Sequence, residues 1–313
     1  MDRKPNSRRP PERGVTLIEL VVVIATLGII AAVAVVLIRQ PLDAYRESAQ
    51  RAELTDIADT ALRRIGRDVR LALPNSIRVT PTTGTPVYME LLLTRNGGRY
   101  RSQQDASFNG DILDFTGTNP VGSDTQFDTL VPMATTLADQ SIVPNDVLVI
   151  FNLFADPTIT QSNAYTRNAA GCATVSNAAC NSTLITGTGA GALANEDRII
   201  FSGRKFPQPS PGNRFHVVSG PVTFACAPNN LPDAQGNGIG TLSRIDTYAI
   251  ALGQAAPPAG TSSLLAKYVT DCQIRYSQAT STQARGLVSL SLSLTRGGET
   301  VTLYHEIHVS NVP

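Results

Sequence analysis

Arg13-Gly14-Val15-Thr16-Leu17-Ile18-Glu19 joins a short basic leader to a long apolar segment, and this junction decides the fold. From Leu20 to Ile38 no residue is charged, and only Thr26 and Gly28 interrupt the apolar side chains. As an α-helix this segment is about 28 Å long, close to the thickness of a bilayer core. Glu19 lies directly before it, where an unpaired charge would cost about 3 kcal/mol in hydrocarbon. The sequence therefore predicts a membrane-spanning helix beside a carboxylate that needs a partner.

The leader, residues 1–14, sets the expected orientation in the membrane. Its charged side chains are five bases and two acids, namely Arg3, Lys4, Arg8, Arg9 and Arg13 against Asp2 and Glu12. Positive residues just before an apolar span stay cytoplasmic, so we expect the chain beyond Ile38 in the periplasm. An ordinary secretory signal is disfavoured because the leader has no apolar core before the junction. We therefore predict a single-pass inner-membrane protein.

The composition is that of a globular chain with one hydrophobic segment at its start. The 313 residues are 42% hydrophobic and 16% charged, with a formal net charge of +1. Without the leader, 21 basic side chains face 23 acidic ones. No basic surface is left that would favour nucleic acid as a partner.

The junction Gly14-Val15-Thr16-Leu17-Ile18-Glu19, followed by an apolar run, resembles the processing site of type IV prepilins and type II secretion pseudopilins. The resemblance implies that a prepilin peptidase cleaves after Gly14 and that the new N-terminus, Val15, is methylated. Val15 stands where most relatives have Phe. In the assembled fibre, the resemblance implies that Glu19 attracts the N-terminal amine of a neighbouring subunit, an attraction that is strong at low dielectric. The alternative is an ordinary signal anchor with one chance carboxylate.

Residues 15–38 form the predicted transmembrane half of a long helix, and residues 39–73 its amphipathic half. Apolar residues of the second half recur mostly three or four apart: Leu42, Tyr45, Ala49, Ala52, Ile57, Ala58, Ala61, Leu62, Ile65, Val69 and Ala72. Pro41 is expected to bend or locally open the helix, and Pro74-Asn75 to end it. A free coiled coil is the alternative, but the alanine-rich positions show no sustained heptad. The second half should therefore pack on a globular partner.

Residues 74–313 are predicted to form a β-rich globular domain. The expected strands are Ile77–Thr80, Val87–Leu93, Asp111–Phe115, Asp146–Phe154, Asp197–Gly203, Phe215–Cys226, Thr241–Leu252, Leu264–Tyr276, Leu287–Thr295 and Thr300–Val309. The last two read as a hairpin with one buried face, around a turn at 296–299. Few βαβ alternations occur, so we predict an α+β fold with a mostly antiparallel sheet. Residues 155–195, rich in Ala, Thr, Asn and Gly, are expected to be a long loop.

Four cysteines predict disulfides formed in an oxidising compartment: Cys172, Cys180, Cys226 and Cys272. We expect Cys172 to pair with Cys180 and Cys226 with Cys272; the other two connectivities and a zinc site are the alternatives. His305 and His308 lie three apart on an expected strand and so face opposite sides. Asp111 with Asp114, or Asp124 with Asp128, could bind calcium, but their oxygen spacing is sparse. No catalytic motif occurs, so we predict neither an enzyme nor a cofactor or metal site.

Three further stretches point to a narrower group within this family. Residues 63–68 (RRIGRD), 71–76 (LALPNS) and the ending 309–313 (VSNVP) resemble the O-type minor pilin of the mannose-sensitive haemagglutinin pilus, which is similar to W-type minor pilins and J-type pseudopilins. The 240 residues from Pro74 onward exceed what a repeated shaft subunit usually carries, which favours a low-copy subunit near the fibre tip.

This resemblance implies four kinds of partner: the prepilin peptidase, other major and minor pilins, the inner-membrane assembly platform and the lipid bilayer. Two alternatives stay open. One is a J-type minor pseudopilin of a type II secretion system, and the other is a tip adhesin that binds a surface ligand through residues 155–195.

Overall fold

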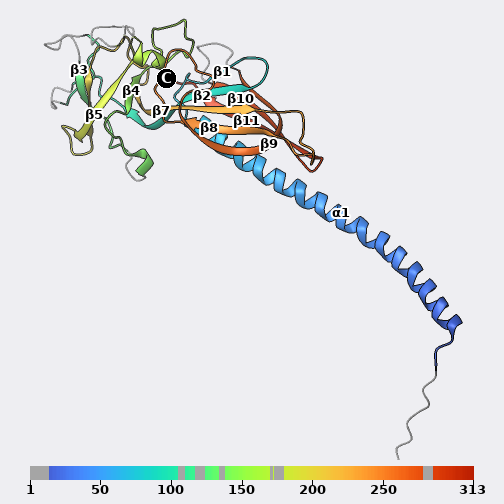
Figure 1. Cartoon of the computed structure of the whole chain (residues 1–313). Coiled ribbons are helices and arrows are strands. Elements are labelled where there is room, and N and C mark those ends of the chain that lie inside the picture. Colours follow the sequence, from blue (N-terminus) through green and yellow to red (C-terminus); the bar gives the residue numbers. More distant parts are fainter. Residues whose placement is uncertain are drawn as a thin grey trace, which may run out of the picture. The chain divides into compact units, whose positions relative to one another are not determined.

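A computed structural model of the chain describes residues 14–104, 110–116, 124–133, 138–169, 172, 180–277 and 285–313. Residues 1–13, which hold nearly all of the predicted leader, lie outside the described part. The chain divides into two compact units, residues 1–52 and 53–313 (Figure 1).

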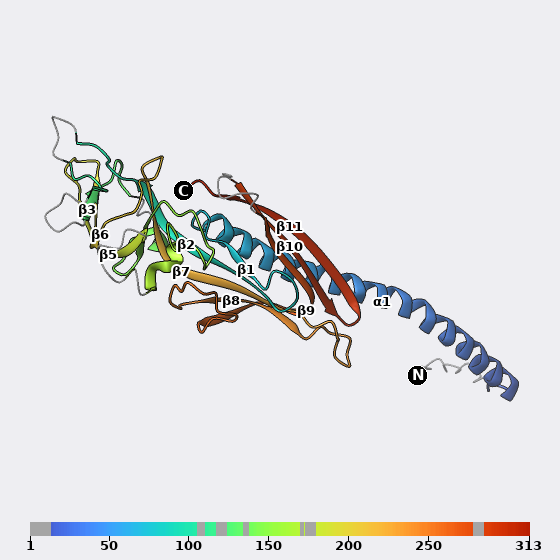
Figure 2. The same cartoon turned by 90° about the horizontal axis from the view of Figure 1, so that it is seen from above.

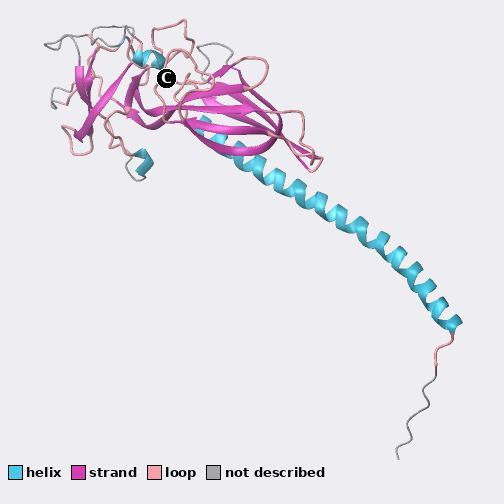
Figure 3. Ribbon diagram, in the orientation of Figure 1, coloured by secondary structure: helices cyan, strands magenta, loops and turns pink. Residues whose placement is uncertain are grey.

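One long helix, α1 (Leu17–Arg70), confirms the predicted N-terminal helix. It is 54 residues long and stays helical through Pro41, so of the bend or local opening that we predicted there, the opening is absent (Figure 3). It ends at Arg70, a few residues before the predicted end at Leu73.

The buried face of α1 is shorter than the apolar pattern predicts. Its buried residues are Leu54, Ala58, Ala61, Leu62, Ile65, Gly66, Asp68 and Val69. Leu42 and Tyr45 belong to the predicted face but are 51% and 73% exposed. The apolar spacing therefore extends about three turns beyond the part of the helix that packs on the sheet.

The described residues of the second unit form an 11-stranded sheet in which every strand pairing is antiparallel, which confirms the α+β fold. The strands are β1 (Arg78–Thr80), β2 (Val87–Arg99), β3 (Asp124–Asp128), β4 (Val147–Ile150), β5 (Ser182–Ala190), β6 (Asp197–Arg204), β7 (Arg214–Ala227), β8 (Gly240–Asp246), β9 (Thr261–Ser277), β10 (Arg285–Arg296) and β11 (Glu299–Ser310). Two short 3-10 helices, η1 (Ala138–Gln140) and η2 (Ala164–Asn168), lie between strands.

Strand β7 is the centre of this sheet (Figure 2). One side of β7 pairs with β2 over almost its whole length. On the other side, residues 223–227 pair with β8 and residues 215–218 pair with β4. The sheet therefore has two arms, β8–β9–β10–β11 and β4–β5–β6–β3.

Each arm has its own apolar core. The buried face of α1 packs with residues of β2, β7, β8, β9, β10 and β11 in the largest cluster. A second cluster, rich in aromatic side chains, is built on the β4–β5–β6–β3 arm and includes Tyr100, Phe127, Phe201, Phe206 and Phe215. Between them a smaller cluster joins Leu73 and Leu92 to Val147 and Tyr165. The helix thus stabilises one arm, while aromatic packing stabilises the other.

The C-terminal hairpin agrees with its prediction. Val288, Leu290, Leu292 and Leu294 are buried on β10, which pairs with β11 in a regular ladder from Arg285↔Ser310 to Arg296↔Glu299. Gly297 and Gly298 connect the strands with φ values of +57° and +85°. A two-residue turn with positive φ at both positions matches the right-handed twist of a hairpin.

Several of the strand predictions were wrong in the middle of the chain. Residues 111–115 form no strand, while β3 and β5 were not predicted. The predicted loop 155–195 contains η2 and β5, and β5 pairs with both β4 and β6. The strands predicted at 146–154 and 241–252 stop at Ile150 and Asp246. These segments lack regular alternation, so their pairing depends on distant partners rather than on a local pattern.

Candidate functional site

The junction between leader and helix places the predicted scissile bond in non-helical backbone. Gly14, Val15 and Thr16 precede the first helical residue, Leu17, and Val15 is 71% exposed. Proteases act on exposed segments whose backbone is not held in regular structure. The Gly14–Val15 bond is therefore accessible, while Glu19 lies inside the helix that follows.

Thr16 fixes the start of this helix. Its Oγ1 accepts a hydrogen bond from the backbone N–H of Glu19 at 3.3 Å, and its carbonyl accepts the N–H of Leu20 at 3.1 Å. This is half of a capping box, which we did not predict although its signature, Thr followed three residues later by Glu, is readable in the sequence. The cap places Glu19 in the first turn, where the helix dipole favours a negative charge.

The helix that follows is apolar enough to cross a membrane. Of the helices in the described part of the chain, α1 alone is long and apolar enough, and its most apolar stretch is not buried. The Thr26 hydroxyl donates to the carbonyl oxygens of Val22 and Val23 at 2.9 and 3.0 Å. Because this side chain is satisfied within its own helix, it adds little to the cost of placing the segment in lipid.

A known family model matches the segment that contains the leader–helix junction. Residues 9–35 match the model of the prokaryotic N-terminal methylation motif. No curated protein and no solved structure matches the chain.

The methylation motif includes Gly14, Val15 and Glu19 within its matched residues. It supports a protein of the type IV pilin-like superfamily, in which a prepilin peptidase processes the N-terminus and the subunit assembles with other pilins. The apolar half of α1 fits a membrane-anchored subunit of this kind. The motif is found in pilins and pseudopilins alike and does not separate O-type, W-type and J-type subunits.

The four cysteines lie in two pairs at disulfide distance. Cys172 and Cys180 have Cα atoms 5.6 Å apart. Cys226 on β7 and Cys272 on β9 have Cα atoms 6.4 Å apart, and 46 positions of sequence separate them. A bond between Cys226 and Cys272 ties the central strand β7 to β9, a strand that is not its neighbour in the sheet.

The acidic residues weighed as calcium ligands come together in the structure, where backbone and side-chain donors already occupy their carboxylate oxygens. Asp128 accepts the N–H of Asp111 at 2.9 Å, and Asp124 accepts the N–H of Asp114 at 2.8 Å. Burial raises the pKa of Asp124 to about 6. The part of the chain that the structure describes holds no group of three or more His, Cys, Asp or Glu side chains suited to a metal.

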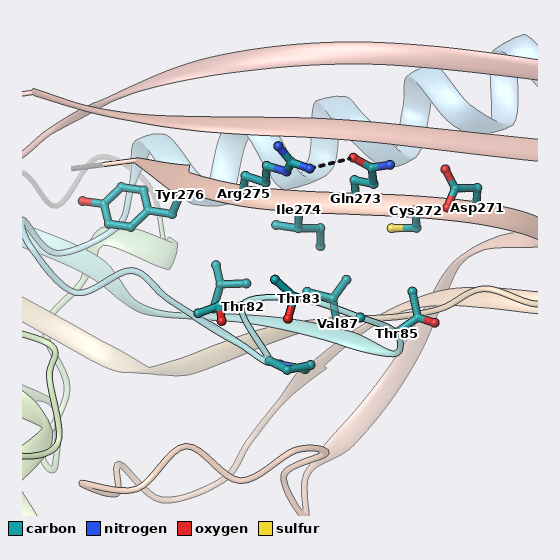
Figure 4. Close-up of a pocket in the computed structure, with 13 residues that line it drawn as sticks. Thr82, Thr83, Thr85, Val87, Asp271, Cys272, Gln273, Ile274, Arg275 and Tyr276 are labelled. Carbon is teal, nitrogen blue, oxygen red and sulfur yellow. Dashed lines mark hydrogen bonds between the residues drawn. The ribbon is translucent and has the colours of Figure 1, made fainter. Parts of the chain in front are cut away.

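A hollow of about 660 Å³ lies between the β1–β2 loop and β9 (Figure 4). Ile274 and Cys272 point from β9 toward the loop, where Thr82 and Thr83 lie opposite them. Arg275 points away from the hollow and donates to Gln273 at 3.5 Å. The side chains that face each other across this hollow are thus apolar groups of β9 and threonine hydroxyls of the loop.

Proposed function

We propose that this protein is a minor pilin, a structural and assembly subunit of a type IV pilus-like fibre. In this proposal residues 1–14 are a leader that prepilin peptidase removes, and Val15 is then methylated. Residues 15–38 anchor the subunit in the inner membrane, residues 39–73 continue the helix, and residues 74–313 form the periplasmic domain. Its partners are other pilins and the inner-membrane assembly platform.

One observation carries the proposal: an exposed, non-helical Gly14–Val15 bond lies immediately before a capped helix whose first turn holds Glu19. Cleavage at this bond would create an ammonium group beside the positive end of the helix dipole. That position is unfavourable for a cation, particularly in lipid, unless a carboxylate is near. The Glu19 carboxylate of a neighbouring subunit would supply this partner.

The first test is a change at Glu19 with a matched control. Glu19→Gln and Glu19→Ala are expected to leave cleavage after Gly14 intact and to lower the amount of the protein in sheared fibres. Glu47→Gln removes a carboxylate from the same helix outside the apolar segment and should leave incorporation unchanged. Normal fibre incorporation of the Glu19 variants would contradict the mechanism.

A second test is mass spectrometry of the mature N-terminus. The proposal requires a polypeptide that begins with N-methylated Val15. A purified protein that still begins with Met1 would refute both the cleavage and the fibre assembly that depends on it.

The size of the domain supports a position near the fibre tip, where a bulky subunit need not pack repeatedly around a shaft. Residues 53–313 form one compact unit with two apolar cores. Because Glu19 is present, another subunit can precede this one in the fibre. Co-purification with pilus components rather than secretion components would separate the minor pilin from a J-type pseudopilin.

The adhesin alternative places its ligand site at residues 155–195, and part of this segment is a strand. Residues 182–190 form β5, and Ile185 is buried in the aromatic core. Deleting residues 155–195 would therefore remove part of the sheet together with any ligand site. Residues 182–190 of this segment therefore belong to the sheet rather than to a loop.

A further inference from the structure

Four arginine side chains line one recess on the second unit. Arg64 and Arg67 come from the last turns of α1, Arg95 from β2 and Arg244 from β8. The recess has a volume of about 280 Å³. The helical pattern of the sequence places Arg64 and Arg67 on a charged helix face, but it does not bring Arg95 and Arg244 to the same place.

Basic side chains outnumber acidic ones among the residues that line the recess. Asp68 and Asp139 are its lining carboxylates. Asp68 is buried and is shared by three of the arginines: Arg244 contacts it at 2.8 Å, Arg64 at 3.8 Å and Arg67 at 3.9 Å. Asp139 is exposed at the rim. Outside the lining, Asp146 pairs with Arg95 and Asp246 pairs with Arg244, so the positive charge that the recess exposes comes from Arg64 and Arg67.

The two helix arginines keep their donors available. Their side chains are 41% and 62% exposed, and their 3.8–3.9 Å contacts with Asp68 are too long for hydrogen bonds. Within the described part of the chain, the side chains of Arg64 and Arg67 donate no hydrogen bond. Arg95 differs, because its Nε lies 3.2 Å from Asp146. Planar guanidinium groups with free N–H donors are suited to bind a carboxylate through two parallel hydrogen bonds.

We propose that this arginine recess docks an acidic side chain of a neighbouring subunit in the fibre, an inference that rests on the proposed function. Arg64 and Arg67 donate to the incoming carboxylate, while Arg95 and Arg244, which are already paired with carboxylates, complete the lining. Leu71, which is 45% exposed, and Leu93 also line the recess. These apolar groups suit the methylene groups of a Glu or Asp side chain, which a free inorganic anion lacks.

The test compares two double variants of the full chain, each with two fewer positive charges on the same helix. Arg64→Gln/Arg67→Gln alters the recess. Arg63→Gln/Arg70→Gln is the matched control, because both residues are exposed on α1 and neither lines the recess. We expect the recess variant to lower the ratio of fibre-bound to membrane-bound protein about tenfold, as for loss of a charged contact at an interface, and the control to change it less than twofold.

A photoreactive amino acid identifies the occupant. Placed at Leu71, it should crosslink to a peptide of another fibre subunit that contains Asp or Glu; placed at Thr60, exposed on α1 outside the recess, it should not give this product. Raised salt should weaken the crosslink at Leu71. Equal incorporation of the two double variants, or a Leu71 adduct with lipid only or with no subunit, would overturn the docking inference.

Failure of the proposed function has a different signature. In that case the wild-type protein itself keeps its leader or is absent from fibres, so both inferences fall together. When wild-type protein is cleaved and incorporated but the recess variant behaves like its control, the docking inference alone is wrong.

Discussion

Replacing Asp68 with Asn should destabilise the protein more than replacing Asp59 with Asn, because Asp68 forms a buried ion pair and Asp59 an exposed one on the same helix. Asp68 is 1% exposed, and one of its oxygens lies 2.8 Å from Nε of Arg244 on β8. This contact joins α1 to the sheet through charge as well as through apolar packing. Asp68→Asn leaves Arg244 buried with only its second carboxylate partner, Asp246, whose side chain is 35% exposed.

Removal of one partner from a buried pair typically destabilises a protein by about 3–5 kcal/mol. Because Asp246 still compensates part of the Arg244 charge, we expect the lower end, about 3 kcal/mol. The matched control is Asp59→Asn. Asp59 contacts Arg63 at 2.6 Å, but the two side chains are 46% and 75% exposed, so its loss should cost less than about 1 kcal/mol.

The assay is thermal unfolding of the full-length protein in detergent, followed by circular dichroism of the sheet. For a unit of this size, about 3 kcal/mol lowers Tm by roughly 6–12 °C, whereas the control should shift it by less than about 4 °C. Equal Tm values for Asp68→Asn and Asp59→Asn would refute the claim that burial makes the difference.

Three further changes test the packing, the ionisation and the crosslinks of the second unit. Ile65→Ala, at a position 1% exposed, should destabilise it by about 2–5 kcal/mol in denaturant unfolding, whereas Leu42→Ala, 51% exposed, should cost less than about 0.5 kcal/mol; similar values would contradict the observed start of the buried face. Because the folded state raises the pKa of Asp124 to about 6, stability should fall as pH rises from about 4 to about 6, by up to about 3 kcal/mol; Asp124→Asn should flatten this dependence in denaturation at several pH values, and an unchanged slope would argue against a raised pKa. Replacing Cys226 and Cys272 with Ser should cost about 4 kcal/mol, compared with about 2.5 kcal/mol for Cys172 and Cys180, because the first pair closes the longer loop; the opposite order would contradict a loop-entropy origin.

Local patterns in the sequence were sufficient at the two ends of the chain. The uncharged segment after Glu19 predicts α1, since an apolar run of bilayer length needs no partner to be recognised. The alternation of Val288, Leu290, Leu292 and Leu294 with polar residues, followed by two glycines, predicts β10 and β11 equally well. The methylation motif can also be recognised from local sequence, because a cleavage site and a helix cap depend only on residues within one or two helical turns of each other.

Tertiary structure decided everything that joins distant residues. The missed strands β3 and β5 have no regular alternation and owe their conformation to pairing with β6 and β4. Burial on α1 begins at Leu54 because the sheet that covers it comes from residues far along the chain. Arg95 and Arg244 join Arg64 and Arg67 for the same reason, since side chains up to 180 residues apart meet only after the strands are paired. The spacing of apolar residues in the sequence shows which face of a helix or strand is apolar. Only the folded sheet determines how much of that face is buried and which charged side chains lie beside it.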